Sequence, residues 1–293
     1  MTLWWQFPVS GVETWLWLPP LLAAGISFFT SMLGISGAFL LVPVQMSLFG
    51  FASPSASATN LVFNLIAIPG GMRRYQREGR LLWPLALTIA AGGAPGALAG
   101  AWLRTHALAE RGHFEPFVAA VLLYLAWRML AVLGTDSRRG AACEIGTLTL
   151  VTWGPREIRF IQGGIEYRVG VPALLGLSAL VGAIGTAYGI GGGSFMVPLC
   201  LVWWRLPLHA IAGATLTATF LTSGVALAAY QWLPAPPGVV AAPDWLLGAA
   251  FGAGGLVGTY LGACCQKYVP QAPLKGLLGI ILLGLAGRYL WPG

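Results

Sequence analysis

The longest uncharged stretch of the chain limits most strongly what it can fold into. From Thr14 to Met72, a run of 59 residues, there is no Asp, Glu, Lys or Arg. As one helix this run would be about 88 Å long at about 1.5 Å per residue, whereas the hydrocarbon core of a bilayer is about 30 Å thick. A membrane-embedded run of this length therefore has to turn back at least once.

The composition places the chain in a membrane. Of its 293 residues 57% are hydrophobic and 9% are charged, and the mean hydropathy is +0.76. Soluble domains carry about 25% charged residues, and disordered chains are poor in large apolar side chains. The composition excludes both classes, and the 41 glycines follow no collagen-like triplet. We predict an all-α polytopic membrane protein.

Charge and cysteines argue against several other classes. The four cysteines, at 143, 200, 264 and 265, form no Cys-x-x-Cys pair and have no zinc-finger spacing. We therefore predict no disulfide framework, no metal site and no cofactor. The net charge of +7 is interpreted as basic cytoplasmic loops, with no nucleic acid as partner. Residues 1–13 carry no Lys or Arg, so we expect no secretory signal there.

Ten apolar segments follow from the positions of charges and turn residues. The stretch 33–38 and the sequence Ser53-Pro54-Ser55 divide the long uncharged run. Tryptophans lie mostly at segment ends, as expected of rings that favour the membrane interface. The expected segments are 16–33, 38–49, 54–72, 81–103 and 116–134 in the first half, and 171–188, 193–204, 208–231, 244–265 and 274–291 in the second.

A short stretch of different composition lies between the two halves. Residues 138–169 carry five arginines and alternate apolar with polar residues, and Gly154-Pro155 and Gly163-Gly164 provide turns. We predict three short strands in a small cytoplasmic β element. The domains are then 1–137, 138–169 and 170–293. A linker packed on the membrane domain is favoured over a regulatory or partner-binding module.

The two halves repeat each other. The segment Gly34–Pro43 aligns with Gly189–Pro198 at an offset of 155, with five of ten positions identical. Beyond the prolines two registers remain. The same offset pairs Asn60 with Thr215 and Asn64 with Thr219, whereas a one-residue gap pairs Ala58-Thr59 with Ala214-Thr215.

The positive-inside rule favours inverted repeats. If the first two segments of each half form a hairpin that returns to its starting side, each half crosses the membrane three times. One side then holds twelve basic residues, Arg73, Arg74, Arg77, Arg80, Arg138, Arg139, Arg156, Arg159, Arg168, Arg205, Lys267 and Lys275, and the other side holds Arg104, Arg111 and Arg288. We expect two inverted repeats of about four helical segments, each with a broken, re-entrant first segment. Both termini are then periplasmic.

The repeated breaks are the candidate site. Irregular backbone at membrane depth is tolerated only inside protein or along a polar cavity, and a helix that starts after a Gly-rich break points its N–H groups at that cavity. Two such starts can hold an anion, with neutral side chains as further donors. The candidate substrate-binding residues are Ser36, Gly37, Gln45, Thr59, Asn60 and Asn64 in the first half and Tyr188, Gly191, Gly192, Gly193, Ser194, Thr215 and Thr219 in the second.

The doubled motif resembles that of a known family. Two Gly-rich segments run into Val42-Pro43 and Val197-Pro198, and each is followed by Ala-Thr, at 58–59 and 214–215. This pattern resembles the TauE/SafE family of sulfite and organosulfonate exporters, over roughly residues 15–290. The resemblance implies a bacterial inner-membrane transporter of small sulfur-containing or carboxylate anions, and no enzyme. Ser36 and Ala38 depart from the glycines of the second copy.

Three rival interpretations stay open. The substrate could be a small carboxylate. Gly34-Ile35-Ser36-Gly37 also matches the Gly-x-Ser-Gly of rhomboid intramembrane proteases, with His209 as the available base. A non-transporting membrane scaffold predicts breaks that are packed shut. No Asp, Glu or His lies deep in an expected span, so the sequence offers no carboxylate proton relay for coupling. The direction of transport, the coupling ion and association as a homo-oligomer are left open, because analogy at the level of the fold does not fix them. The glycines at 92–100 and 252–258 are interpreted as helix-packing sites.

Overall fold

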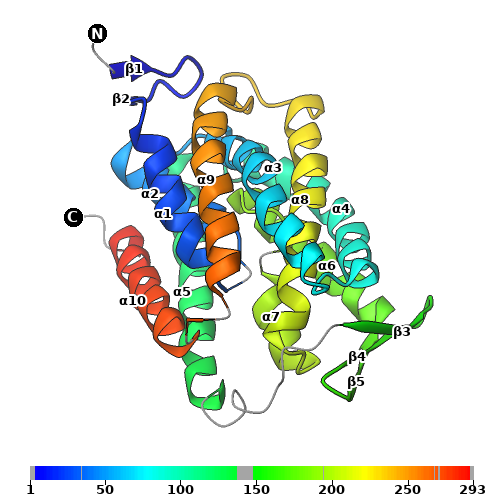
Figure 1. Ribbon diagram of the computed structural model, residues 1–293. Helices are drawn as coiled ribbons and strands as arrows, with labels where there is room; N and C mark the ends of the chain where they lie inside the picture. Colours follow the sequence, from blue (N-terminus) through cyan, green and yellow to red (C-terminus); the bar gives the residue numbers. More distant parts are fainter. Residues whose placement is uncertain are drawn as a thin grey trace.

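The computed structural model describes residues 4–33, 35–136, 148–193, 195–266, 268–269 and 271–290. Within these ranges the chain forms ten helices and five short strands (Figure 1). In chain order they are β1 (Trp4–Gln6), β2 (Glu13–Trp15), α1 (Leu18–Ser31), α2 (Ala38–Leu48), α3 (Pro54–Arg77), α4 (Trp83–His106), α5 (Arg111–Asp136), β3 (Thr149–Trp153), β4 (Glu157–Gln162), β5 (Ile165–Gly170), α6 (Val171–Tyr188), α7 (Met196–Trp203), α8 (Leu208–Trp232), α9 (Trp245–Cys265) and α10 (Gln271–Leu290).

Each expected apolar segment overlaps one of these helices, and the main differences lie at charged ends. The sequence predicts segments 54–72 and 116–134, but α3 continues to Arg77 and α5 begins at Arg111. The extra turns carry ion pairs between neighbouring turns, Arg74 with Glu78 and Arg111 with Glu115, both at 2.6 Å. Such pairs support a helix beyond its apolar part, which a boundary drawn at the first charge misses.

Six of the described helices are long and apolar enough to cross a membrane, namely α4, α5, α6, α8, α9 and α10. The 24-residue α3 is long enough but more polar, and its first eleven residues are all buried. A polar helix is tolerated in a membrane protein when other helices surround it. The fold is therefore mostly helical, with α3 and the largely buried α8 near its centre.

Helices of the two halves pack against each other. Helix α1 packs along α9 and α6 along α4; α3 also contacts α9, and α8 also contacts α4. Helix α3 contacts α8, and α5 pairs with α10 (Figure 1). If α1–α5 are matched in order with α6–α10, the α1–α9 pairing corresponds to α6–α4 and the α3–α9 contact corresponds to α8–α4.

Glycines allow the closest of these helix pairs. A Cβ added at Gly96 or Gly100 of α4 would collide with the backbone of α6, and one at Gly254 or Gly258 of α9 would collide with the backbone of α1. Small residues let membrane helices approach until their backbones touch. The interpretation of these glycines as packing sites is confirmed.

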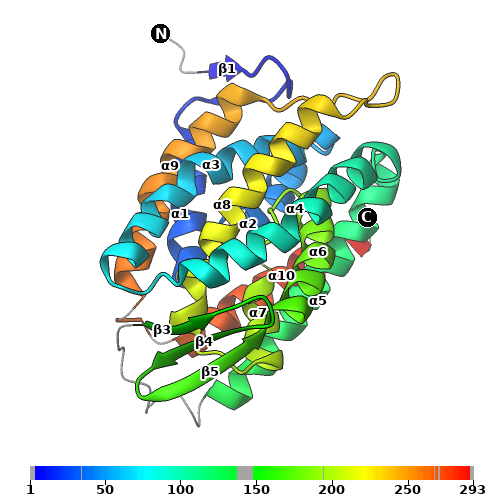
Figure 2. The same ribbon diagram turned by 90° about the vertical axis from the view of Figure 1, so that its right-hand side faces the viewer.

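Two small sheets lie at opposite ends of the molecule (Figure 2). Strands β3, β4 and β5 form an antiparallel sheet in that order, in agreement with the three strands predicted between the halves; residues 138–147 of that element lie outside the described residues. The hairpin of β1 and β2 was not predicted, because strands of three residues leave no readable alternation. We call the two ends the hairpin end and the sheet end.

The broken segments each start and finish at one end of the molecule. Helix α2 ends near the hairpin end, where Ser55 N donates to Val240 O (3.1 Å) in the loop before α9. Helix α6 starts at the sheet end, directly after β5, and Val171 N donates to Arg156 O (2.9 Å) there. The chain returns to the same end after α7, because Gly213 in the first turns of α8 lies against Arg80. Figure 2 shows α7 beside the three-stranded sheet.

Candidate functional site

The first break lies between α1 and α2 and is fixed by Ser36. The buried Ser36 hydroxyl donates to Asn64 Oδ1 of α3, and Ala38 N at the start of α2 donates to Ser36 Oγ (3.2 Å). A hydroxyl that accepts from an amide in the first turn satisfies a donor that has no partner within the helix. Ser36 therefore ties the start of α2 to the polar face of α3.

The second break, between α6 and α7, depends on glycine. Gly189 and Gly191 have φ values of +97° and +79°, in the left-handed region that favours glycine. A Cβ at Gly191 would lie 2.7 Å from Ser223 Oγ, and one at Gly193 would collide with the backbone of α8 at Thr215. Gly192 N donates to Thr222 Oγ1 (3.1 Å). The predicted Ser194 lies outside the described residues.

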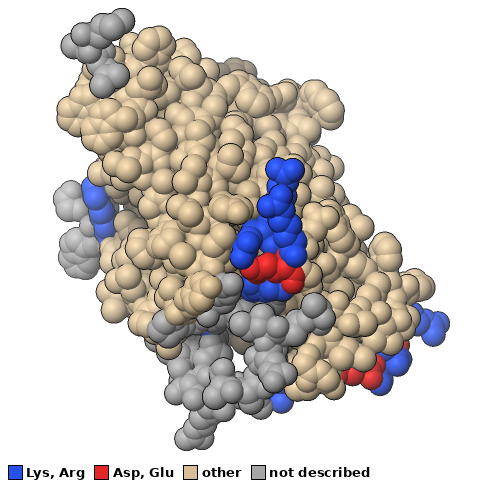
Figure 3. All heavy atoms as spheres, in the orientation of Figure 1, with Lys and Arg blue, Asp and Glu red and all other residues tan. Residues whose placement is uncertain are grey.

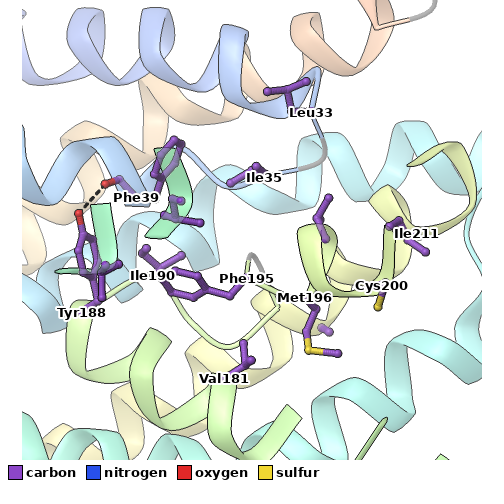
Figure 4. Packing of buried hydrophobic residues seen from close by; sticks show 14 of the residues in the cluster. Leu33, Ile35, Phe39, Val181, Tyr188, Ile190, Phe195, Met196, Cys200 and Ile211 are labelled. Atoms are coloured by element: carbon purple, nitrogen blue, oxygen red, sulfur yellow. Dashed lines mark hydrogen bonds between the residues drawn. The ribbon is translucent and has the colours of Figure 1, made fainter. Parts of the chain in front are cut away.

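The two breaks contact each other. Asn64 Nδ2 donates to Ile190 O (2.7 Å) and to Ser223 Oγ (3.1 Å), while its Oδ1 accepts from Ser36. Tyr188 donates in the opposite direction, from its hydroxyl to Phe39 O (3.0 Å), as Figure 4 shows. The fully buried Asn64 thus holds the first break with its oxygen and the second with its nitrogen.

A second polar pair lies at the start of α2. Gln45 Nε2 donates to Asn60 Oδ1 (2.6 Å), and Asn60 Nδ2 donates to Ala38 O (2.9 Å). Both side chains are fully buried. Gln45 Oε1 has no hydrogen-bond partner. Because a buried polar atom without a partner is costly, this oxygen is an acceptor that a donor could still satisfy.

Contacts at the breaks favour one of the two repeat registers. Ser36 contacts Asn64, and at an offset of 155 Gly191 lies against Thr219. Asn60 bonds to the backbone of Ala38, and at the same offset Thr215 lies against Gly193. A one-residue gap would place Leu216 and Phe220 at these positions instead. The offset of 155 therefore continues through α3 and α8.

Several predicted site residues lie at the breaks without offering a free donor. Thr215 and Thr219 donate to carbonyls of their own helix, Ile211 O (2.9 Å) and Thr215 O (2.8 Å), as hydroxyls in membrane helices often do. Gly37 packs against Ser27 and Phe63.

Thr59 serves a different contact, away from both breaks. Its hydroxyl accepts from Asp244 N (2.9 Å) at the start of α9.

The space between the breaks is closed. A cavity of about 10 Å³ lies there, which is about the least that holds one water molecule. Its lining is apolar and comes from both breaks and from α5 and α10: Ile35, Phe39, Leu125, Met129, Ile190, Phe195 and Leu282. The polar side chains described above bond to one another on the α3 and α8 side, and the cavity that the described residues enclose here is too small for an anion.

A buried cation near the second break was missed from the sequence. Arg104, which the sequence only assigns to the less basic side of the membrane, is fully buried. Its Nη2 donates to Ala52 O (2.6 Å), its Nη1 donates to Leu108 O, and its guanidinium lies 3.5 Å from the Phe114 ring centre. Carbonyls at the end of α4 favour a cation there, which the pattern of apolar residues does not reveal.

Ser57 connects Arg104 to the second break. Arg104 Nε donates to Ser57 Oγ (3.2 Å), and the Ser57 hydroxyl lies within hydrogen-bonding distance of Ala187 O (3.2 Å) and Tyr188 O (3.4 Å). Ser57 and Ser223 were also missed, because the sequence does not say which neighbour a small hydroxyl faces in a helix buried on all sides.

The comparisons with known proteins decide the family. A sequence model described as "Sulfite exporter TauE/SafE" matches residues 20–289, which include both breaks and all helices from α2 to α9. The chain belongs to the TauE/SafE family. It is also similar to the "Probable membrane transporter protein y4hK" of Sinorhizobium fredii (strain NBRC 101917 / NGR234), with 25% identity over 248 residues, 84% of this chain and 87% of that protein. No solved structure matches the chain.

TauE/SafE membership and the six apolar helices identify a multi-pass membrane transporter. The resemblance seen in the doubled motif is thereby confirmed at the level of the family. Among the described residues, no group of three or more His, Cys, Asp or Glu side chains could hold a metal ion. The chemistry of the breaks rests on amides, hydroxyls and backbone groups.

Proposed function

We propose that this TauE/SafE transporter moves small anions, foremost sulfite or organosulfonates, across the bacterial inner membrane through a site between the two breaks. The observation that carries the proposal is the position of Asn64, which bonds to both breaks at once. Binding sites of transporters built from repeats lie where two discontinuous helices meet. Asn64 marks that meeting point.

The donors at this point suit an oxyanion. The starts of α2 and α7 carry the positive ends of their helix dipoles. The carboxamides of Asn60, Asn64 and Gln45 and the hydroxyl of Ser36 donate hydrogen bonds without a permanent charge. Arg104, which reaches the second break through Ser57, adds a positive charge near the proposed site. Sulfite and sulfonates offer three oxygens to such donors.

The closed cavity is interpreted as an occluded state of a transport cycle. Packed-shut breaks are what the scaffold alternative predicts, but an alternating-access transporter also passes through a state with no open site. In this state the donors bond to each other, Ser36 to Asn64 and Gln45 to Asn60. An entering anion would replace these bonds as the two halves move apart.

The arrangement of the breaks supports inverted repeats. Helix α1 starts and helix α2 ends at the hairpin end, whereas helix α6 starts and helix α7 ends at the sheet end. The basic residues of α3 and of the three-stranded sheet lie at the sheet end, which the positive-inside rule then places in the cytoplasm. Each break would open toward its own side, which gives an anion access first from one side and then from the other.

The substrate class is tested by flux in liposomes that contain the purified protein. Sulfite, sulfoacetate, taurine, thiosulfate and acetate are loaded in turn, with protein-free liposomes as the control. We expect saturable flux of a sulfur oxyanion or sulfonate. Saturable flux of acetate alone would establish the carboxylate alternative, and no flux of any of them from folded protein would favour the scaffold.

The protease alternative makes a separate prediction. Ser36 Oγ donates to the carboxamide of Asn64, and a side-chain amide cannot serve as the general base that a serine nucleophile needs. We therefore propose that the chain is not an enzyme. Replacing Ser36 by Ala should lower anion flux, and neither the wild type nor the variant should cleave a membrane-embedded peptide.

A further inference from the structure

A groove runs along the outer surface where the end of α3 crosses α9. Gly70 allows the crossing, because a Cβ there would lie about 3.0 Å from both the carbonyl oxygen and the side chain of Leu256. Beside the crossing is a groove of about 330 Å³, bounded by Gly70, Arg73 and Arg77 on α3 and by the face of α9 that carries Leu256 to Leu261. This volume is at the lower limit of small-molecule sites, about 300 to 1,000 Å³.

One wall of the groove is basic and lacks a counter-charge. Arg73 and Arg77 lie one turn apart on the same face of α3, and both are exposed. Neither forms an ion pair within the described residues, because Glu78 is held by Arg74 (2.6 Å) and Arg80 (2.8 Å). Figure 3 shows basic side chains gathered around an acidic one in the middle of this face, with the other charges near its edges.

The other wall is apolar and faces outward. Leu256, Val257, Tyr260 and Leu261 recur at helical spacing and are between 39% and 54% exposed, so α9 presents this face to the surroundings of the protein. In a membrane protein an exposed apolar helix face contacts acyl chains. Tyr260 lies in the last turns of α9, at the level where aromatic rings favour the membrane interface.

The basic wall is not part of the repeated transport core. At the offset of 155, Arg73 and Arg77 correspond to Ala228 and Trp232 of α8, a helix with no Lys, Arg, Asp or Glu. The repeat architecture is therefore satisfied without these two charges. They are specific to the sheet end of the first half.

We propose that this groove binds one anionic phospholipid. The phosphate lies between the guanidinium groups of Arg73 and Arg77, which offer paired N–H donors to its oxygens, and an acyl chain follows the apolar face of α9. A lipid fits better than a soluble phosphate, because it alone fills both walls. Anionic lipids are concentrated in the cytoplasmic leaflet, and that leaflet meets the sheet end in the proposed orientation.

Native mass spectrometry with equal amounts of phosphatidylglycerol and phosphatidylcholine tests the proposal on the intact protein. Replacing both Arg73 and Arg77 by Gln should weaken retention of phosphatidylglycerol about 25-fold, roughly fivefold for each arginine at an anionic surface. The matched control, Arg156→Gln with Arg168→Gln, removes two exposed charges from the sheet at the same end and should change retention by less than about twofold.

A third variant separates the groove from the surface charge. Val257→Trp fills the apolar wall, keeps both arginines and should also reduce retention of phosphatidylglycerol; it decides the matter if the double variant fails to fold. Equal losses in the groove and control variants would overturn the proposal, as would equal retention of phosphatidylcholine by the wild type. Displacement of the lipid by inorganic phosphate alone would likewise contradict a site for a whole phospholipid.

Discussion

Buried polar side chains at the two breaks bond mostly to one another and to backbone carbonyls, and these contacts explain both what the sequence predicts and what it misses. Ser36, Asn60, Asn64 and Tyr188 lie at the breaks as predicted, because the break itself and the helix spacing from it define their positions. Thr59 does not, since its face of α3 meets the start of α9. Whether any of these residues binds a substrate stays a prediction.

Arg104 provides a test at the residue scale. Arg104→Gln should lower the free energy of unfolding by about 2 to 4 kcal/mol, because Ala52 O and Leu108 O lose a charged donor in a buried place. Thermal unfolding of the purified protein measures this. Arg111→Gln is the control, since the Arg111 side chain is 60% exposed and its pair with Glu115 is worth about 0.5 kcal/mol. Equal effects of the two variants would contradict the structural role of Arg104.

At the scale of elements, the sequence predicts where helices lie better than where they end. Runs of apolar residues and Gly-rich breaks locate all ten helices, since both are local signals. Ends that carry ion pairs, as in α3 and α5, extend past the apolar run. The hairpin of β1 and β2 depends on a distant residue, because Asp244 at the start of α9 accepts from Val9 N (3.2 Å) and from Ser10 N (2.9 Å).

Asp244 tests how the hairpin is held. In Asp244→Asn a carboxylate oxygen that accepts from the hairpin is replaced by an NH₂ donor or keeps a weaker, neutral acceptor. The amides of Val9 and Ser10 should then exchange their hydrogens at least about tenfold faster, because hydrogen bonds to a charged acceptor are worth about 1.5 to 3 kcal/mol. Glu13→Gln, at an exposed position of the same hairpin, is the control and should leave the exchange of these two amides unchanged. Hydrogen exchange followed by mass spectrometry measures both variants. Unchanged exchange in Asp244→Asn would contradict the role of Asp244 in holding the hairpin.

Gly96 tests the packing of α4 on α6. Gly96→Leu should destabilise the protein by at least about 3 kcal/mol, because the new side chain has to displace the backbone at Ala179. Gly176→Leu introduces the same side chain into α6 at an exposed glycine with nothing within 4 Å and should be tolerated. Size-exclusion profiles and thermal unfolding compare the two. A Gly96→Leu protein as stable as the Gly176→Leu protein would show that the helices are not in contact there.

At the scale of the whole molecule, the pairing of α1 with α9 and of α4 with α6 interleaves the two halves. This arrangement could not be predicted from the sequence, because contacts between residues many tens of positions apart, and more than two hundred apart for α1 and α9, leave no periodic pattern. The repeat itself is readable, because ten aligned residues with a shared Val-Pro are a local match. The membrane orientation follows from charge alone and stays a prediction.

Labelling of single cysteines tests that orientation. In a variant without its natural cysteines, Val9→Cys in the N-terminal hairpin should react with a membrane-impermeant thiol reagent in intact cells. Ile165→Cys, exposed on β5, should react only after the cells are opened, because the sheet end is predicted to be cytoplasmic. The reversed pattern would overturn the orientation. Labelling of both cysteines in intact cells would show that the hairpin end and the sheet end do not lie on opposite sides of the membrane.

The most direct test of a site shared by both breaks is sulfite or sulfonate flux in liposomes with Asn64→Leu. Leucine has a similar size, but it cannot accept a hydrogen bond from Ser36 or donate one to Ile190 O. Flux should fall at least about tenfold, because a buried hydrogen bond to the substrate or between the breaks is lost. Thr217→Val, whose hydroxyl bonds only within its own helix at Gly213 O (2.9 Å) among the described contacts, should transport like the wild type. Wild-type flux through the folded Asn64→Leu protein would contradict a transport site between the breaks.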